Sequence, residues 1–347
     1  MWDTMTALTC PHEKALTLLF AELEATATEQ RVAFLGTPGN LTQRTNESGT
    51  KFWVHRYSDA VGRRQETYLG TNDDQAVPAR LESLRKRIEE ANATIARVRV
   101  LARAGFATVD RKTYSTLATL HNHGLFRAGA VLIGSHAFGA LLNALGVETV
   151  PYVTEDVDIA RSEALALPEL PAFIDMLRET GIEFFEVPAL NRRRRPTSFK
   201  EGGRSRLKVD LLAPSPGEGY PIIPVPELKA HAKGLPCLRY LLEDSQEVPV
   251  LSPHGVVLVR VPVPERYAIH KLVVSQLRAK TSSKPAKDLR QAATLIEALV
   301  ERFPGAVEDA LTAVPRSAVR HVRRAAAALT RYLPASAEAA WEALTTP

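Results

Sequence analysis

The sequence has 347 residues and a mass of 38.0 kDa, with 45% hydrophobic and 24% charged residues. This composition is typical of a soluble globular protein of two or three domains, and it excludes a disordered chain, a collagen-like fibre and a disulfide-stapled miniprotein. No window approaches the roughly 18 to 20 consecutive apolar residues of a membrane span, and the N-terminus has no basic start followed by an apolar run. Cys10 and Cys237 are the two cysteines. We therefore expect a cytoplasmic protein with reduced thiols and no membrane partner.

Positive charge is concentrated in one stretch of the chain. The net charge is +5, whereas residues 192–240 contain eleven Lys or Arg against four Asp or Glu. A local excess of this kind attracts the phosphate groups of nucleotides or nucleic acids. The alternative interpretation is a solvated surface loop.

Residues 1–109 indicate an accessory N-terminal module. The spacing of apolar residues predicts a helix over 12–29, and alternation with a central turn predicts a β-hairpin over 51–70. The hairpin carries three aromatic side chains among arginines, which could stack bases or form cross-strand pairs: Trp53, Tyr57 and Tyr68. An apolar stripe with charged flanks predicts a long helical arm over 78–104.

The rest of the chain divides into a central domain over 110–260 and a helical C-terminal domain over 261–347. Apolar residues recur at helical spacing throughout the last part of the sequence. Proline clusters over 214–226 and 248–264 predict loops and a domain edge.

The segment 129–160 predicts a strand, a tight turn and a helix. Ala130–Ile133 is a short apolar run, Gly134 and Ser135 end it, and residues 136–145 have helical spacing. A turn of this type places backbone N–H groups and a hydroxyl at a helix N-terminus, where phosphate binds well. By itself the turn is a weak signal.

Two carboxylates strengthen this interpretation. Asp156 and Asp158 flank Val157 in a predicted strand, so both carboxylates face the same side. Adjacent carboxylates resist joint ionisation, and hard oxygen ligands suit Mg²⁺ or Mn²⁺. The alternative is a solvated strand edge.

A further carboxylate is predicted on a neighbouring buried strand. Asp210 alternates with Val209 and Leu211 within residues 207–214. An ionised side chain there requires a partner. That partner is either a metal ion shared with Asp156 and Asp158 or an arginine in a structural ion pair.

These residues together resemble the DNA polymerase β-like nucleotidyltransferase superfamily. The resemblance implies an α+β protein with the minimal nucleotidyltransferase fold, a mixed sheet flanked by helices. It implies that Gly134 and Ser135 hold the phosphates of an NTP, and that Asp156, Asp158 and Asp210 bind two Mg²⁺ (or Mn²⁺) ions. Ser135 and Asp156 are further apart than is typical of the superfamily, and Ile133 replaces its usual second glycine.

The C-terminal segment over 262–296 is similar to the AbiEii and MenT toxin-type nucleotidyltransferases. Lys271 matches a lysine on the helix after the core, and Lys287–Asp288 matches the start of the next helix. The resemblance implies that Lys271 neutralises charge on the triphosphate and that Asp288 belongs to the catalytic set. On the residues alone, Lys271 could instead snorkel or pair with Asp288, and Asp288 could be an N-terminal charge or cap.

Basic and imidazole side chains near the predicted site complete the set. His136 could touch phosphate or base, or serve in packing, whereas we expect His270 to be a buried partner rather than a base. An acceptor RNA could be guided by the basic residues between the two acidic strands, unless these form a solvated insertion: Arg192, Arg193, Arg194, Arg195, Lys200 and Arg204.

We therefore expect metal-dependent transfer of a nucleoside monophosphate from an NTP to a hydroxyl, with release of pyrophosphate. The resemblance and the basic segment favour an RNA or tRNA acceptor, a toxin or phage-defence role and a neutralising antitoxin. One alternative is an enzyme of the same fold that modifies a protein or small molecule. The other is a nucleic-acid-binding protein without turnover.

Overall fold

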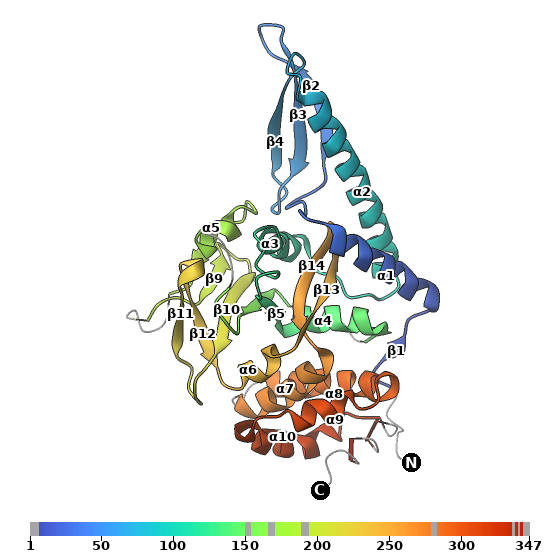
Figure 1. Ribbon diagram of the computed structural model, residues 1–347, viewed down its shortest axis with the longest axis vertical. Coiled ribbons are helices and arrows are strands. Elements are labelled where there is room, and N and C mark those ends of the chain that lie inside the picture. The colour runs from blue at the N-terminus through green and yellow to red at the C-terminus, as the bar shows by residue number, and fades with distance from the viewer. Residues whose placement is uncertain are drawn as a thin grey trace.

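The computed structural model describes residues 7–149, 154–165, 171–188, 194–278, 283–334, 337–338 and 341–342, and Figure 1 labels its elements. In this part of the chain no helix combines the length and apolarity needed to cross a membrane. The expected mixture of a sheet and flanking helices is confirmed.

A seven-stranded mixed sheet forms the centre of the molecule. The strand order along its main path is β11-β12-β10-β7-β5, with β9 beside β10 and β8 beside β9. Strands β7 and β10 are parallel, whereas β5 is antiparallel to β7. The seven strands are β5 (Val131–Ile133), β7 (Asp156–Ala160), β8 (Phe184–Glu186), β9 (Ser198–Glu201), β10 (Lys208–Pro214), β11 (Ile222–Val225) and β12 (Ala230–Leu235).

The central strands form because apolar residues alternate with polar ones, as the sequence predicted. On one face Val157, Ile159, Val209 and Leu211 are all buried. The opposite face carries the acidic residues at the beginning of β7 and β10. The same alternation therefore builds the core on one face and directs the acidic side chains to the other.

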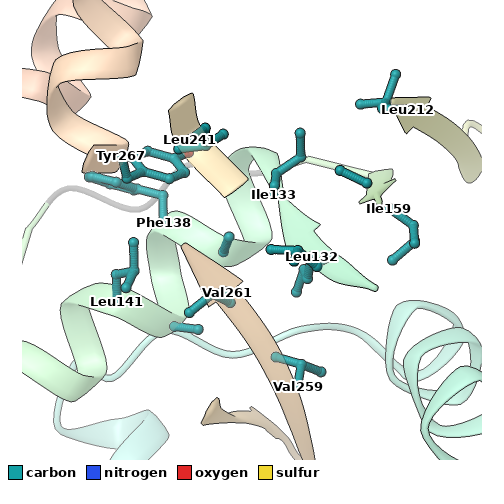
Figure 2. Packing of buried hydrophobic residues seen from close by; sticks show 14 of the residues in the cluster. Leu132, Ile133, Phe138, Leu141, Ile159, Leu212, Leu241, Val259, Val261 and Tyr267 are labelled. Atoms are coloured by element: carbon teal, nitrogen blue, oxygen red, sulfur yellow. The ribbon is translucent and has the colours of Figure 1, made fainter. Parts of the chain in front are cut away.

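One large hydrophobic core joins this sheet to the surrounding helices and hairpin. Figure 2 shows buried side chains of this core from β5, β7, β10, α6, α7 and β14, together with those of α4 (Gly134–Leu145). The hairpin consists of β13 (Ser245–Ser252) and β14 (Gly255–Pro262), and α3 (Arg111–Asn122) packs against it. Beside α3 lies the short α5 (Phe173–Arg178).

An N-terminal arm projects from this body, as Figure 1 shows. It consists of the long helix α2 (Val77–Arg103) and a three-stranded sheet of β2 (Asn40–Thr45), β3 (Lys51–Ser58) and β4 (Arg64–Thr71). At its base, α1 (Lys14–Glu29) packs against α2 and β14. The short strands β1 (Cys10–Pro11) and β6 (Val147–Glu148) pair nearby.

The C-terminal helices cover the opposite end of the body. They are α6 (Leu238–Leu242), α7 (Pro264–Leu277), α8 (Lys284–Arg302), α9 (Ala306–Thr312) and α10 (Arg316–Leu329), and a short turn of 3₁₀ helix (Pro226–Leu228) precedes β12. The expected helical C-terminal part is thus confirmed for the described residues.

Two local predictions need correction. A third strand, β2, pairs with the predicted hairpin over 51–70. The ring centres of Phe52 and Tyr68, on neighbouring strands, lie 5.8 Å apart, which supports the cross-strand alternative for the aromatic residues. The prolines over 248–264 do not mark loops, because most of that segment is the β13–β14 hairpin. A two-stranded hairpin tolerates Pro249, since a strand with one partner leaves N–H positions unpaired. The domain limits at 109 and 260 stay a prediction.

Candidate active site

The turn between β5 and α4 has a backbone that only glycine fits well. Gly134 has a φ of +74°, which disfavours any side chain, and a Cβ there would collide with the carboxylate of Asp158. The Tyr267 hydroxyl donates a hydrogen bond to the Gly134 carbonyl at 2.7 Å. The predicted turn is therefore pressed against the acidic strand on one side and held by α7 on the other.

The first turn of α4 offers backbone N–H groups to an anion. Its N-cap residue is Ile133, which provides no side-chain hydrogen bond to these groups. Ser135, the second residue of α4, accepts a hydrogen bond from Lys287 Nζ at 2.9 Å. A helix N-terminus with an adjacent ammonium group is suited to phosphate.

The predicted carboxylates lie on adjacent strands in matching register. Asp158 pairs with Asp210 across β7 and β10, and Asp156 pairs with Lys208 two residues earlier. Directly paired residues project from the same face of a sheet. The structure therefore brings all three acidic side chains to the same face, next to the glycine–serine turn.

The acidic cluster is electrostatically strained. Burial, followed by the charges of Asp210 and Asp156, raises the pKa of Asp158 to about 6. Asp210 Oδ1 is buried and accepts no hydrogen bond from the described residues. These two carboxylates carry more negative charge than their protein neighbours compensate.

A lysine is the protein partner of Asp210, for which the sequence predicted a metal ion or an arginine. Lys208 Nζ lies 2.8 Å from Asp210 Oδ2 and 3.8 Å from Asp156 Oδ1. Burial lowers the pKa of Lys208, but the hydrogen bond from Lys208 to Asp210 and the charges of all three aspartates together outweigh this effect, so the net pKa is raised. Lys208 is thus a cation that bridges two strands of the acidic cluster.

The acidic cluster has the donor chemistry of a divalent-metal site but not a finished metal geometry. Among the described residues, no group of three or more His, Cys, Asp or Glu is arranged to hold an ion. The orphaned Asp210 oxygen and the raised pKa of Asp158 both fit a hard cation that binds carboxylate oxygens. A cation held by all three aspartates would have to compete with the ammonium of Lys208.

A second charged cluster lies at α7 and α8. Lys271 Nζ lies 3.0 Å from Asp288 Oδ1, and Arg278 Nε lies 2.5 Å from Asp288 Oδ2. Asp288 is only 2% exposed and is the fifth residue of α8, whose N-cap is Ser283. The alternative of an N-terminal cap is therefore wrong, and the alternative of a partner for Lys271 is confirmed.

The two predicted histidines are both buried. His136 faces a cavity of about 480 Å³, which is also lined by Asp110, Ser135 and Thr154. Its Nε2 has no hydrogen-bond partner in the described part of the chain, and burial lowers its pKa to about 4. His270 is also buried, and burial followed by the charge of Lys271 lowers its pKa to about 3. Both lowered pKa values favour neutral rings near pH 7. The buried position expected of His270 is confirmed, and a contact of His136 with phosphate or base stays a prediction.

The predicted basic residues are distributed over several places. Arg194 and Arg195 line a second cavity beside β9, and Lys200 pairs with Lys208 in the register of β9 and β10. Arg204 lies in the turn between β9 and β10 and lines neither cavity. Arg192 and Arg193 lie outside the described residues.

Three contributors to the site were not predicted: Lys208, Tyr267 and Arg278. Lys287 was predicted at the start of its helix together with Asp288, but its contact with Ser135 was not. Lys208 could have been found, because it precedes Asp210 by two residues and shares its face. Lys287 and Tyr267 reach the glycine–serine turn from remote helices. Their roles depend on the packing of α7 and α8, which no local sequence pattern encodes.

Comparison with known protein families matches residues 111–315 to a family described as nucleotidyltransferase. The matched segment contains the glycine–serine turn, the three aspartates and both charged clusters. No curated protein and no solved structure matches the chain.

Proposed function

Because this chain belongs to the nucleotidyltransferase family, we propose that it transfers a nucleoside monophosphate from an NTP to an RNA hydroxyl in a metal-dependent reaction. The bond between the α- and β-phosphates of the NTP is broken, a bond from the α-phosphorus to the acceptor oxygen forms, and pyrophosphate leaves. The acceptor hydroxyl loses its proton in this exchange.

One observation carries the proposal: the register of β7 and β10 beside the glycine–serine turn. Asp158 pairs with Asp210, and a Cβ at Gly134 would collide with Asp158. Phosphate groups bound at the first turn of α4 would therefore lie directly beside the acidic cluster. The turn favours anions, whereas the acidic cluster favours cations. The two sites can act together when a divalent cation accompanies the phosphates.

The residues of the chain support distinct parts of this reaction. The N–H groups of α4 and the ammonium of Lys287, which bonds to Ser135, would bind phosphate oxygens. Lys271, held by Asp288 beside Asp158, adds positive charge where negative charge develops on the departing phosphates. Asp156, Asp158 and Asp210 would hold the divalent ions, which supply charge neutralisation and activation of the acceptor oxygen when bound.

RNA is the acceptor that the charge of the chain favours. Arg194 and Arg195 lie beside β9, the strand that pairs with the Asp210 region of β10. A basic surface at this position attracts a polyanion in a salt-dependent manner. The tRNA end, the toxin or phage-defence role, the antitoxin and the narrower AbiEii and MenT resemblance stay predictions of the sequence comparison.

A labelling assay tests the proposal. The protein is incubated with each α-³²P NTP, total bacterial RNA and Mg²⁺ or Mn²⁺, beside the Asp156→Ala/Asp158→Ala variant as control. We expect label on RNA that disappears in the control. Label on protein or on a small molecule would replace RNA by that acceptor class. RNA binding without transfer of label from any NTP would contradict nucleotidyl transfer and favour a binding protein.

A further inference from the structure

A second cavity lies on the same face of the sheet as the acidic cluster. It has a volume of about 390 Å³, and its wall includes Ser198, Tyr220 and Lys233 together with Arg194 and Arg195. This volume is within the range of small-molecule pockets, at the size of one nucleotide. Figure 1 shows the strands concerned, β9, β11 and β12, on one side of the body, where β9 and β12 pair with successive parts of β10.

The strand register connects this cavity to the acidic cluster. Ser198 of β9 pairs with Asp210 of β10. This part of the cavity wall therefore lies next to β10, on the face of the sheet that carries Asp210. Lys233 of β12 pairs with Leu212, which lies two residues beyond Asp210 on the same face. A molecule in the cavity is thus beside the acidic cluster, one strand away from Asp210.

The chemistry of the wall favours a nucleotide. Three of the described wall residues are cationic and none of them is acidic. Tyr220 is 47% exposed, and Lys233 Nζ lies 5.3 Å from the centre of its ring. An exposed aromatic ring among cations can stack a base while the cations contact the phosphates.

We propose that this cavity, formed by Arg194, Arg195, Tyr220 and Lys233, is an acceptor subsite for the 3′-terminal nucleotide of single-stranded RNA. The terminal base stacks on Tyr220, and the preceding phosphates contact the arginines and Lys233. A single strand fits because its unpaired base can enter a pocket, whereas a paired base in a helix cannot. The inference rests on the proposed function, since it places the reacting hydroxyl beside Asp210.

Two substitutions isolate the subsite from the phosphate-binding turn. Tyr220→Leu removes the ring, and Tyr220→Phe retains it as a matched control. Arg194→Ser/Arg195→Ser removes two cations, and Arg323→Ser/Arg324→Ser removes two exposed cations from α10 as the charge control. All four positions in the arginine pairs are exposed, so the fold should survive these changes.

The first measurement is direct binding of a short fluorescent single-stranded RNA with a free 3′ hydroxyl, without NTP. We expect Tyr220→Leu and Arg194→Ser/Arg195→Ser each to weaken binding by roughly tenfold, with both controls within about twofold of the native protein. Affinity for an NTP analogue should stay unchanged in every variant. Unchanged RNA affinity in both test variants, or no RNA binding by the native protein, would overturn the subsite.

The second measurement separates the subsite from the proposed function. In the labelling assay, the test variants should raise the KM for RNA and leave the KM for NTP unchanged. Unaltered KM for RNA would overturn the subsite while RNA nucleotidyl transfer stands. RNA binding that depends on Tyr220 but yields no transfer would retain the subsite and overturn the proposed reaction.

Discussion

The two charged clusters beside the glycine–serine turn have opposite imbalances. In the acidic cluster, Asp156 and Asp210 share the ammonium of Lys208, and Asp210 retains an oxygen that bonds to no described residue. In the cluster at α7 and α8, a single buried carboxylate, Asp288, is shared by Lys271 and Arg278. The first cluster therefore attracts a cation, and the second attracts an anion.

The two clusters lie close enough to interact electrostatically. The charge of Lys271 lowers the pKa of Asp158, although burial and the neighbouring aspartates dominate and raise it. The Tyr267 ring lies 5.1 Å from Lys271 Nζ, and its hydroxyl bonds to Gly134. A metal–triphosphate complex carries both signs of charge and would complement both clusters at once.

The largest expected effect is on catalysis at the acidic cluster. Asp158→Asn should reduce nucleotidyl transfer by roughly a thousandfold, because a charged ligand for the cation is lost. The same variant should be more stable than the native protein near pH 7, since ionisation of Asp158 is unfavourable in the fold. Transfer assays and urea unfolding measure the two effects. Lower stability would contradict the strain assigned to this cluster.

The opposite stability change is expected in the cationic cluster. Asp288→Asn should lower the free energy of unfolding by about 3 kcal/mol, because two cations lose their buried partner. The matched control is Asp175→Asn, which breaks an exposed pair with Arg178 and should cost less than about 1 kcal/mol. Equal urea midpoints for the two variants would show that Asp288 is not a structural counter-ion.

The neutral ring beside Lys271 predicts a pH effect on stability. The pKa of His270 is about 3 in the fold against 6.5 as its ordinary value, so the unfolded chain binds a proton between these limits and the folded chain does not. Its contribution to stability is complete above pH 6.5 and declines on acidification. Between about pH 7 and 5, protonation of His270 in the unfolded chain should lower the free energy of unfolding of the native protein by about 2 kcal/mol. This loss should be absent in His270→Gln. Urea unfolding at several pH values measures this loss. An equal decrease in the free energy of unfolding of the two proteins would contradict the prediction.

The smallest expected effect concerns the phosphate-binding turn. Lys287→Met removes the ammonium that bonds to Ser135, so the KM for NTP should rise about tenfold, with folding preserved. Lys86→Met, on the exposed arm helix, serves as the matched control and should leave the KM unchanged. An unaltered KM in Lys287→Met would remove this lysine from triphosphate binding.

Local patterns predicted the parts of the site that lie on single elements. Val157 and Ile159 alternate with Asp156 and Asp158, and this period of two already determines which side chains are buried. The strand before the glycine–serine turn could be predicted because Ala130–Ile133 is a short apolar run that Gly134 and Ser135 end. The register that aligns Asp158 with Asp210 connects residues 52 positions apart, so only the assembled sheet shows it.

Contacts between remote elements could not be predicted. Arg278 reaches Asp288 only because α7 and α8 pack together, and Lys287 reaches Ser135 over 152 residues of sequence. Pro249 was misleading because proline is depleted in strands, yet the β13–β14 pairing accommodates it. The strand propensity of a residue is a weak guide to its secondary structure where pairing between strands contributes the larger free energy.

The most direct test of the central claim measures nucleotide binding across both clusters. Calorimetry would compare a non-hydrolysable NTP analogue with and without Mg²⁺, in the native protein and in Asp158→Asn. If the acidic cluster binds the cation of a metal–triphosphate complex, Mg²⁺ should strengthen binding by roughly tenfold or more in the native protein and have little effect in the variant. Equal responses to Mg²⁺ in the two proteins would contradict the assignment of the acidic cluster to metal-dependent nucleotidyl transfer.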